Sequence, residues 1–382
     1  MNRFVRALVL SLMTVSLAVP VAVADTPETW RVYIGTYTRG DSEGIYQLEL
    51  NAETGELTSH GLAAATENPS FLALHPELPA VYAVGQTDAG GTVSAFAVEP
   101  ASGALSPINA QSSEGPGPCH VAVSPDGALV AVANYSGGNI ALLPVREDGG
   151  LEAATSVMQH EGSSVHPRQQ APHAHAVIFD APGRHLFAAD LGIDKMMSYE
   201  VEGNALVPNE PPHAELAPGA GPRHFVFHPS GRFAYAVNEL DNTVTAFAYD
   251  ADNGALEAIH TIGTLPDDFD ESNTTAEIRV HPTGRFLYAS NRGHDSIAAF
   301  AIDEDTGRLE ALGQTSTQGE TPRNFNLDPT GTWLLAANQA TDSVVVFAID
   351  PEQGTLTPTG QVLEVPMPVC VLFVPVGHPA AE

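Results

Sequence analysis

The sequence predicts an all-β fold, a seven-bladed β-propeller whose blades have four strands each. The first observation is a recurring unit: an apolar strand, often a Pro-x-Gly turn, and a second strand that ends on a small or polar residue. The second strands end at Gly35, Gly85, Asn134, Asp190, Asn238, Asn291 and Asn338. The second observation is their spacing of 47 to 56 residues, which is typical of propeller blades. The third is a turn-rich composition of 34 glycines and 30 prolines, so we expect the 382 residues to form one closed array.

Each copy is expected to begin with its innermost strand. We assign the inner strands to residues 69–76, 118–125, 172–180, 222–229, 276–282, 322–329 and 368–375. The second strands are assigned to residues 31–35, 80–85, 129–134, 185–190, 233–238, 286–291 and 333–338. Third strands alternate apolar and polar residues, as in 243–248 and 343–348. Outer strands follow Gly-x-Leu turns at Gly55, Gly103, Gly254, Gly307 and Gly354.

The two ends of the array are out of phase, which predicts how the ring closes. The N-terminal part supplies a second strand, 31–35, with no inner strand before it. The C-terminal part supplies an inner strand, 369–374, with nothing after it. The two halves therefore complete one blade, and closure removes exposed sheet edges. We place the propeller domain at residues 30–377.

Residues 1–24 are interpreted as a secretory signal peptide. Arg3 and Arg6 precede an apolar run over 7–21, and Ala-Val-Ala at 22–24 matches a cleavage site, which places cleavage near Ala24. The alternative, a membrane anchor, is disfavoured because the run is short for a membrane span. We expect a periplasmic or secreted protein that has no membrane contact after cleavage.

Charge limits the class of partner. The chain has 15 basic and 46 acidic residues, for a net charge of −31, and Lys195 is its single lysine. Such a surface repels nucleic acid and anionic lipid, so we expect a small-molecule partner. No stretch resembles a phosphate loop, a CxxC pair or a GxSxG elbow, and we expect no cofactor. We also expect a monomer, and we expect Cys119 and Cys370 to be free thiols.

The predicted topology brings two sets of residues to one mouth of the central channel, because inner strands start where second strands end. The starts contribute His120, His173, His175, Arg223, His224, Glu277, Arg279, Arg323 and Asn324. The ends contribute Asn134, Glu239, Asn291 and Arg292. Much of the scarce positive charge gathers here, which indicates an anionic ligand or an oxyanion formed during reaction.

Structural roles for the same residues remain open. The arginines can form salt bridges with Glu239, Glu277 and Asp190, and the recurring asparagines can cap loops. His173 and His175 form an H-x-H pair, but no third ligand follows at a telling spacing, so we expect no metal. His75, His228 and His281 recur at the turns and are expected to be structural.

Several of these stretches together resemble the bacterial propeller-type 6-phosphogluconolactonases. They are residues 117–122 (Gly-Pro-Cys-His-Val-Ala), 133–138 (Ala-Asn-Tyr-Ser-Gly-Gly), 221–224 (Gly-Pro-Arg-His), 238–240, 276–282, 290–295 (Ser-Asn-Arg-Gly-His-Asp) and 321–325. The likeness covers roughly residues 30 to 375. The wider family is similar to fungal carboxymuconate-lactonising propellers, whose catalytic histidine, arginine and glutamate match His175, Arg223 and Glu239 by motif order.

The resemblance implies a lactonase that opens a sugar-derived lactone without a cofactor. In this hypothesis His175 or Glu239 is the base toward water and Arg223 stabilises the oxyanion. Arg279, Arg292 or Arg323 would hold a phosphate or carboxylate. The signal peptide departs from the family pattern, because a phosphorylated lactone of sugar metabolism is cytosolic, so another sugar lactone is an alternative substrate.

Three other functions fit the same sequence. A non-catalytic protein would bind an anionic sugar saturably without opening a lactone. A scaffold for protein partners would fill the arginine-lined mouth with its own side chains. A metal-dependent lactonase would be sensitive to chelators.

Overall fold

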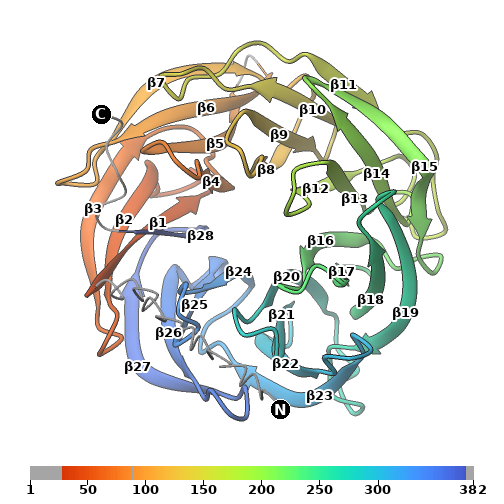
Figure 1. Ribbon diagram of the computed structural model, residues 1–382. Coiled ribbons are helices and arrows are strands. Elements are labelled where there is room, and N and C mark those ends of the chain that lie inside the picture. The colour runs from red at the N-terminus through yellow and green to blue at the C-terminus, as the bar shows by residue number, and fades with distance from the viewer. Residues whose placement is uncertain (1–27, 88–89, 376–382) are drawn as a thin grey trace, which may run out of the picture.

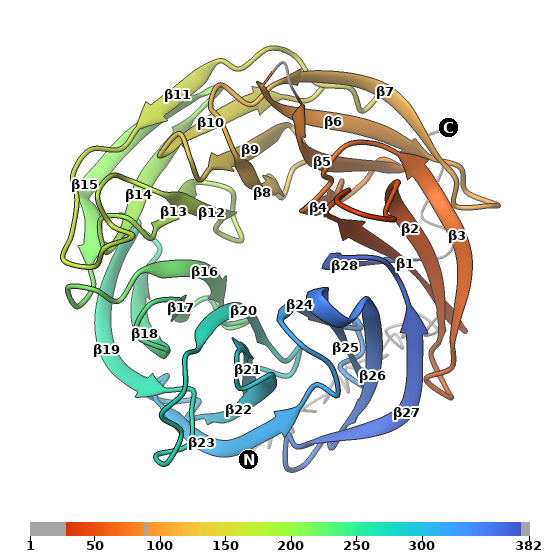
Figure 2. The same ribbon diagram turned by 180° about the vertical axis from the view of Figure 1, so that it is seen from behind.

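Seven four-stranded antiparallel sheets stand around a central axis, as the sequence predicts (Figure 1). This computed structural model describes residues 28–87 and 90–375, and the predicted signal peptide lies outside them. The blades follow each other around the ring in chain order, and each blade except the shared one begins with its innermost strand (Figures 1 and 2).

The first four blades, from inside to outside, contain the following strands. They are β28 (Pro368–Pro375), β1 (Thr29–Thr36), β2 (Gly44–Asn51) and β3 (Leu57–Ala65); β4 (Leu72–Leu74), β5 (Ala80–Thr87), β6 (Gly90–Val98) and β7 (Leu105–Ser112); β8 (Pro118–Val123), β9 (Leu129–Asn134), β10 (Asn139–Pro144) and β11 (Ser156–Gln159); β12 (Ala174–Phe179), β13 (His185–Asp190), β14 (Lys195–Glu202) and β15 (Ala205–Glu215).

Three further blades complete the ring. They are β16 (Pro222–Phe227), β17 (Phe233–Asn238), β18 (Thr243–Asp250) and β19 (Ala255–Gly263); β20 (Thr274–Val280), β21 (Phe286–Arg292), β22 (Ser296–Ile302) and β23 (Leu309–Ser316); β24 (Pro322–Leu327), β25 (Trp333–Asn338), β26 (Ser343–Ile349) and β27 (Leu356–Glu364). The predicted inner strand 69–76 is shorter in the structure, where residues 69–71 precede β4, because Pro69 has no N–H to donate and Asn68 before it has a φ of 49°.

The shared blade closes the ring as predicted. Strand β28 pairs antiparallel with β1 from Trp30↔Pro375 to Thr36↔Pro368. The starts of the inner strands also lie opposite the ends of the second strands, as in the pairs Pro118↔Asn134 and Pro222↔Asn238. The predicted convergence of both residue sets on one face of the ring is therefore confirmed.

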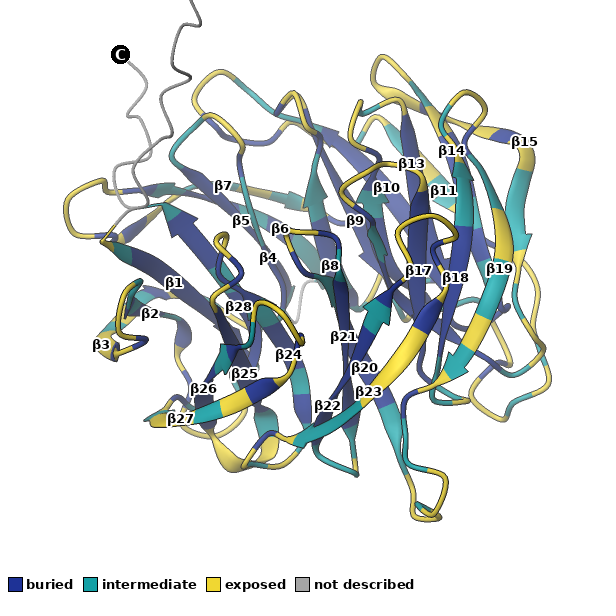
Figure 3. Ribbon diagram, turned by 60° about the horizontal axis from the view of Figure 1, so that its bottom comes forward, coloured by how far each residue is buried: buried dark blue, intermediate teal, exposed yellow. Residues whose placement is uncertain are grey.

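The core lies between the blades. Strands β9, β13, β17 and β25 are buried at every position, because each blade packs on a neighbour through both faces (Figure 3). Outer strands such as β23 and β27 are largely exposed (Figure 3). In the described ranges the helical content is one 3₁₀ turn, η1 (Gln339–Thr341), and no helix there is long and apolar enough to cross a membrane.

Repeated hydrogen bonds tie several neighbouring blades together. The buried hydroxyls of Tyr33, Tyr82, Tyr235 and Tyr288 donate to the carbonyls of Gly103, Gly149, Gly307 and Gly354 at 2.6–3.1 Å. The turn histidines His75, His228 and His281 donate from Nε2 to turn glycine carbonyls of the next blade at 2.8–3.1 Å. The predicted structural role of these histidines is thus confirmed.

Candidate active site

β-Bulges deliver several site residues to the channel. In β8, Pro118 pairs with Asn134 and His120 pairs with Ala133, so Cys119 between them has no partner on β9. The same interruption leaves His175, Arg223 and Arg323 as the extra residues of β12, β16 and β24. A bulge locally breaks the alternation of a strand and re-aims the extra side chain. In these four blades one side chain is thereby turned out of the regular pattern.

A pocket of about 740 Å³ opens at this mouth. His175, Glu239, Arg292 and Arg323 from the predicted set line it. Among its described lining residues four are arginines, and Glu239 is the single acid, which leaves a net of three positive charges. The volume suits a small molecule, and the sign of the charge favours an anionic one.

Glu239 is the hub of the pocket wall. Its Oε1 lies 2.6 Å from Arg168 Nη1, and its Oε2 lies 2.9 Å from Arg223 Nε and 3.0 Å from Arg292 Nη2. The Glu239 side chain is only 4% exposed, so the carboxylate is almost entirely desolvated. Arg168 also donates to the hydroxyl of Tyr135 at 3.1 Å. These contacts fix three guanidinium groups around one carboxylate.

Burial and the neighbouring charges determine the protonation states of Glu239 and Arg223. Burial opposes ionisation of Glu239, but Arg292, Arg223 and Arg168 together hold the pKa of its carboxyl well below the usual range. Burial, with help from Arg292 and Arg323, lowers the pKa of Arg223 to about 9. Glu239 is therefore a stable anion and a weak proton acceptor, while Arg223 stays charged at neutral pH.

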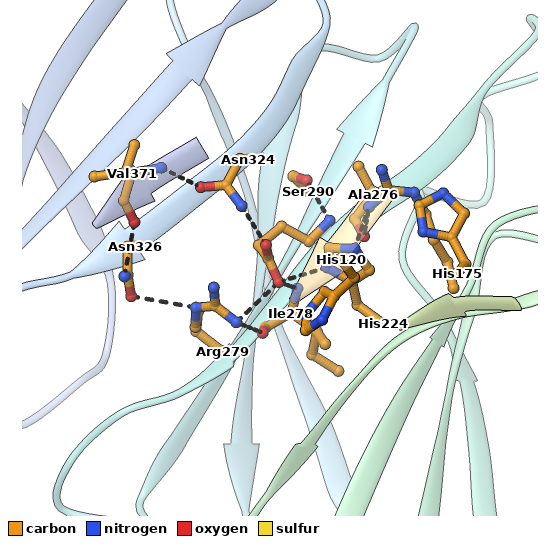
Figure 4. Close-up of polar contacts among 12 residues, drawn as sticks. His120, His175, His224, Ala276, Ile278, Arg279, Ser290, Asn324, Asn326 and Val371 are labelled. Carbon is orange, nitrogen blue, oxygen red and sulfur yellow. Dashed lines mark hydrogen bonds and ion pairs between the residues drawn. The ribbon is translucent and has the colours of Figure 1, made fainter. Parts of the chain in front are cut away.

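A second carboxylate, Glu277 on β20, is fully buried and does not line the pocket. Its Oε1 accepts hydrogen bonds from His224 Nδ1 and the Ile278 N–H at 3.0 and 2.9 Å and lies 3.0 Å from Arg279 Nη1, while Asn324 donates to its Oε2 (Figure 4). His224 Nε2 in turn accepts from Arg223 Nη1 at 3.1 Å. The two carboxylates are thus joined through Arg223 and His224, and these partners fix the tautomer of His224 with its proton on Nδ1.

The channel histidines are neutral at ordinary pH. Burial, together with the nearby charge of Arg223, lowers the pKa of His120, His175 and His224 well below its usual value. His120 also stacks on Phe71 with ring centroids 4.0 Å apart. Within the described residues, Nε2 of His175 makes no hydrogen bond, and this side chain lines the pocket. His175 is consequently a neutral imidazole on the cavity wall, and its Nε2 can accept a proton in the tautomer whose ring proton is on Nδ1.

Cys119 also lines the pocket but has the properties of a packed thiol. Its Sγ lies 3.4 Å from the carbonyl oxygen of His175 and 3.8 Å from Nδ1 of the same residue. Burial raises the pKa of this thiol to about 12. Both cysteines are free, as predicted. A protonated thiol is a poor nucleophile, so the chemistry rests on other groups.

Several predicted site residues lie away from the pocket wall. Asn134 and Asn291 are fully buried, and each donates from Nδ2 to a loop carbonyl, that of Ser113 at 2.7 Å and that of Thr264 at 3.2 Å. Both asparagines therefore cap loops, the structural role left open in the sequence analysis, and their side chains do not line the cavity. His173 donates to the Tyr135 carbonyl at 2.9 Å and stacks on its ring, so it supports a lining residue.

The expected salt bridges are only partly those observed. Glu239 and Glu277 pair with arginines, whereas Asp190 pairs with His160 at 2.6 Å. Asp190 also accepts from the His173 N–H at 2.7 Å, so it anchors both ends of the loop 160–173. Among residues 28–87 and 90–375, no three His, Cys, Asp or Glu side chains form a group that could hold a metal ion.

Sequence reasoning missed Arg168, Tyr37 and Arg39 as pocket residues. Arg168 lies in the loop 160–173, within the longest of the six spacings, the 56 residues between Asn134 and Asp190. An arginine in the longest spacing of a strongly acidic chain was the feature that could have marked Arg168 as a pocket residue. No comparable signal marked Tyr37 and Arg39, which follow β1 in the shared blade.

Fold and site together define a propeller enzyme with a pocket for a small molecule. The family model described as "Lactonase, 7-bladed beta-propeller" matches residues 31–373. The chain belongs to this lactonase family, and its sequence-based resemblance to it is confirmed. It is accordingly a hydrolase of the carboxylic-ester class that opens lactones.

Two relatives and one solved structure illustrate the likeness. The 6-phosphogluconolactonase of Bacillus subtilis is 40% identical over 293 residues, which is 77% of this chain and 83% of the relative. The 6-phosphogluconolactonase of Formosa agariphila is 34% identical over 77% of this chain and 85% of its own length. The structure of the periplasmic gluconolactonase of Pseudomonas aeruginosa has a TM-score of 0.87 and 35% identity, and covers 91% of this chain and 99% of that one.

Proposed function

We propose that the protein hydrolyses a sugar-derived lactone in this pocket, with His175 as the base that activates water. The observation that carries the proposal is a neutral imidazole on the wall of a cationic pocket, beside a carboxylate that arginines keep ionised. A lactone is a neutral ester whose carbonyl oxygen becomes negative in the transition state. A pocket that offers both a free base and fixed positive charge suits that change.

Electrostatics favour His175 over Glu239 as the base. The pKa values of both groups are lowered, but both carboxylate oxygens of Glu239 are engaged by three arginines, which leaves them poorly available to a proton. His175 is unprotonated, and its Nε2 is free of partners among the described residues. Glu239 then has a positioning role, because it fixes the guanidinium groups around it.

Arg292 is better placed than Arg223 to stabilise the oxyanion. Arg223 is only 2% exposed, donates to the Ala276 carbonyl at 2.7 Å and does not line the pocket. Arg292 shares the same carboxylate oxygen of Glu239 and lines the cavity. Arg223 has an indirect role, because it contacts the same oxygen of Glu239 and so helps to fix the carboxylate that positions Arg292.

The reaction balances with these residues alone. The water oxygen bonds to the lactone carbonyl carbon while its proton passes to Nε2 of His175. Arg292 holds the negative carbonyl oxygen of the tetrahedral intermediate. The bond from that carbon to the ring oxygen then breaks, the ring oxygen takes the proton from His175, and the product is the open hydroxy acid.

The substrate class and place of action follow from the relatives and the N-terminal segment. The relatives are named for gluconolactones with and without a 6-phosphate, so we propose an aldonolactone or its phosphate ester. The apolar segment 7–21 and the Ala-Val-Ala site support export of the mature chain to the periplasm or beyond.

A lactone screen tests the proposal. Acid release from gluconolactone, its 6-phosphate and other aldonolactones is followed in a pH-stat, and spontaneous opening is subtracted. The expected result is saturable, enzyme-dependent acid release from at least one of them. Saturable binding of the sugar acids with no lactone opening would instead identify a binding protein.

A further inference from the structure

Two arginines from neighbouring blades meet on one aromatic ring at the pocket. Arg39 follows β1 in the shared blade, and Arg323 is the bulge residue of β24. The guanidinium carbon of each lies 5.4 Å from the centroid of the Tyr37 ring. All three residues line the pocket. Guanidinium groups held near an aromatic ring keep their N–H edges available to a ligand.

These two arginines differ from the others at the channel mouth in lacking an acidic partner. Arg168, Arg223 and Arg292 are paired with Glu239, and Arg279 is paired with Glu277. Within residues 28–87 and 90–375, neither Arg39 nor Arg323 makes an ion pair or a hydrogen bond. Arg39 is exposed and Arg323 is half-buried, so both guanidinium groups on the pocket wall are accessible to a ligand and no acid of the described residues neutralises them.

We propose that Arg39, Arg323 and Tyr37 form a subsite for a second anionic group of the substrate, remote from the lactone carbonyl. The group is a phosphate ester or a carboxylate, since both accept paired N–H donors from guanidinium. The proposal rests on the proposed function. Arg292 and His175 act on the ester, while the Tyr37 subsite selects substrates that carry a further negative charge.

Selectivity between matched substrates tests this subsite. We compare kcat/KM for gluconolactone, its 6-phosphate and a lactone with a terminal carboxylate, in wild type, Arg39→Gln, Arg323→Gln and the double variant. Loss of one charge-assisted hydrogen-bonding partner is expected to cost about 10- to 100-fold on the anionic lactone that is the substrate. The neutral lactone should change less than about threefold. The two anionic lactones distinguish phosphate from carboxylate.

A matched control is Arg232→Gln. Arg232 lies over the Phe233 ring at 5.1 Å but does not line the pocket, so the charge change and the cation–π contact are similar. This variant should keep the wild-type preference. Equal losses on neutral and anionic lactones in the double variant would show a structural role, and no loss on either would show no role; both overturn the proposal.

Product binding separates this proposal from the proposed function. Calorimetric titration with gluconate and gluconate 6-phosphate reports the subsite without any turnover. If no lactone is opened but the phosphorylated acid binds more tightly and loses that advantage in the double variant, the subsite stands and the lactonase mechanism fails. If lactones are opened with no preference for an anionic one, the mechanism stands and the subsite fails.

Discussion

Neutralising Glu239 should destabilise the protein substantially, because three guanidinium groups share its charge. Glu239→Gln keeps the shape of the side chain but leaves Arg168, Arg223 and Arg292 facing one another. Arg168 is 41% exposed, so its ion pair contributes at most about 1 kcal/mol. Arg223 and Arg292 have side chains only 3% and 12% exposed, and leaving such buried charges unpaired costs about 3–5 kcal/mol. We therefore expect the free energy of unfolding to fall by about 3–5 kcal/mol.

Urea unfolding followed by tryptophan fluorescence measures this loss, since urea does not screen charges. A double-mutant cycle with Arg223→Met isolates one pair: removing both partners should recover about 1–3 kcal/mol of the loss. The matched control is Glu352→Gln, because Glu352 pairs with Arg285 at 3.5 Å on the surface with side chains 80% and 41% exposed. That variant should change stability by less than about 0.5 kcal/mol. Equal stability of Glu239→Gln and Glu352→Gln would refute the argument.

Three further predictions concern the oxyanion, acid stability and the loop. Arg292→Gln should lower kcat on the lactone about 10²–10³-fold in pH-stat assays, and unchanged kcat would remove it as the oxyanion donor. Because the folded state keeps His120, His175 and His224 neutral with lowered pKa values, the unfolded chain binds more protons below pH 6.5. Stability should thus fall with acid by up to about 1.4 kcal/mol per pH unit for each histidine, and equal urea midpoints at pH 7.5 and 5.5 would contradict this. Asp194→Asn removes a carboxylate that accepts hydrogen bonds from Ser164, Gln169 and the Gly219 N–H, and so loosens the loop 160–173. Trypsin should therefore cut after Arg168 about tenfold faster. Unaltered cleavage would show that Asp194 does not hold the loop.

Most of the fold can be predicted from the sequence, because each blade is one continuous segment with its own strand and turn pattern. Each blade restates the same strand and turn pattern, so the register of one blade predicts the others, and the unmatched ends predict the shared blade. The convergence of inner-strand starts and second-strand ends follows from antiparallel pairing alone. His175, Glu239, Arg292 and Arg323 could therefore be assigned to the pocket without coordinates.

The details that sequence could not give depend on side-chain direction and on irregular segments. A bulge at Arg223 turns one guanidinium beneath Glu239, while the same bulge at Arg323 leaves another open to the cavity. Periodicity does not distinguish those two outcomes. Arg168 enters from a loop with no strand pattern, and Asn134 and Asn291 turn toward loop carbonyls that lie more than 20 residues away in the chain.

The central claim is that neutral His175 activates water against a lactone in this pocket. The most direct test is the kcat of His175→Gln on the best lactone at pH 7, corrected for spontaneous opening, with binding of the product acid measured on the same variant. We expect kcat to fall about 10²–10⁴-fold while product binding stays within about threefold. A kcat within about threefold of wild type would contradict the account.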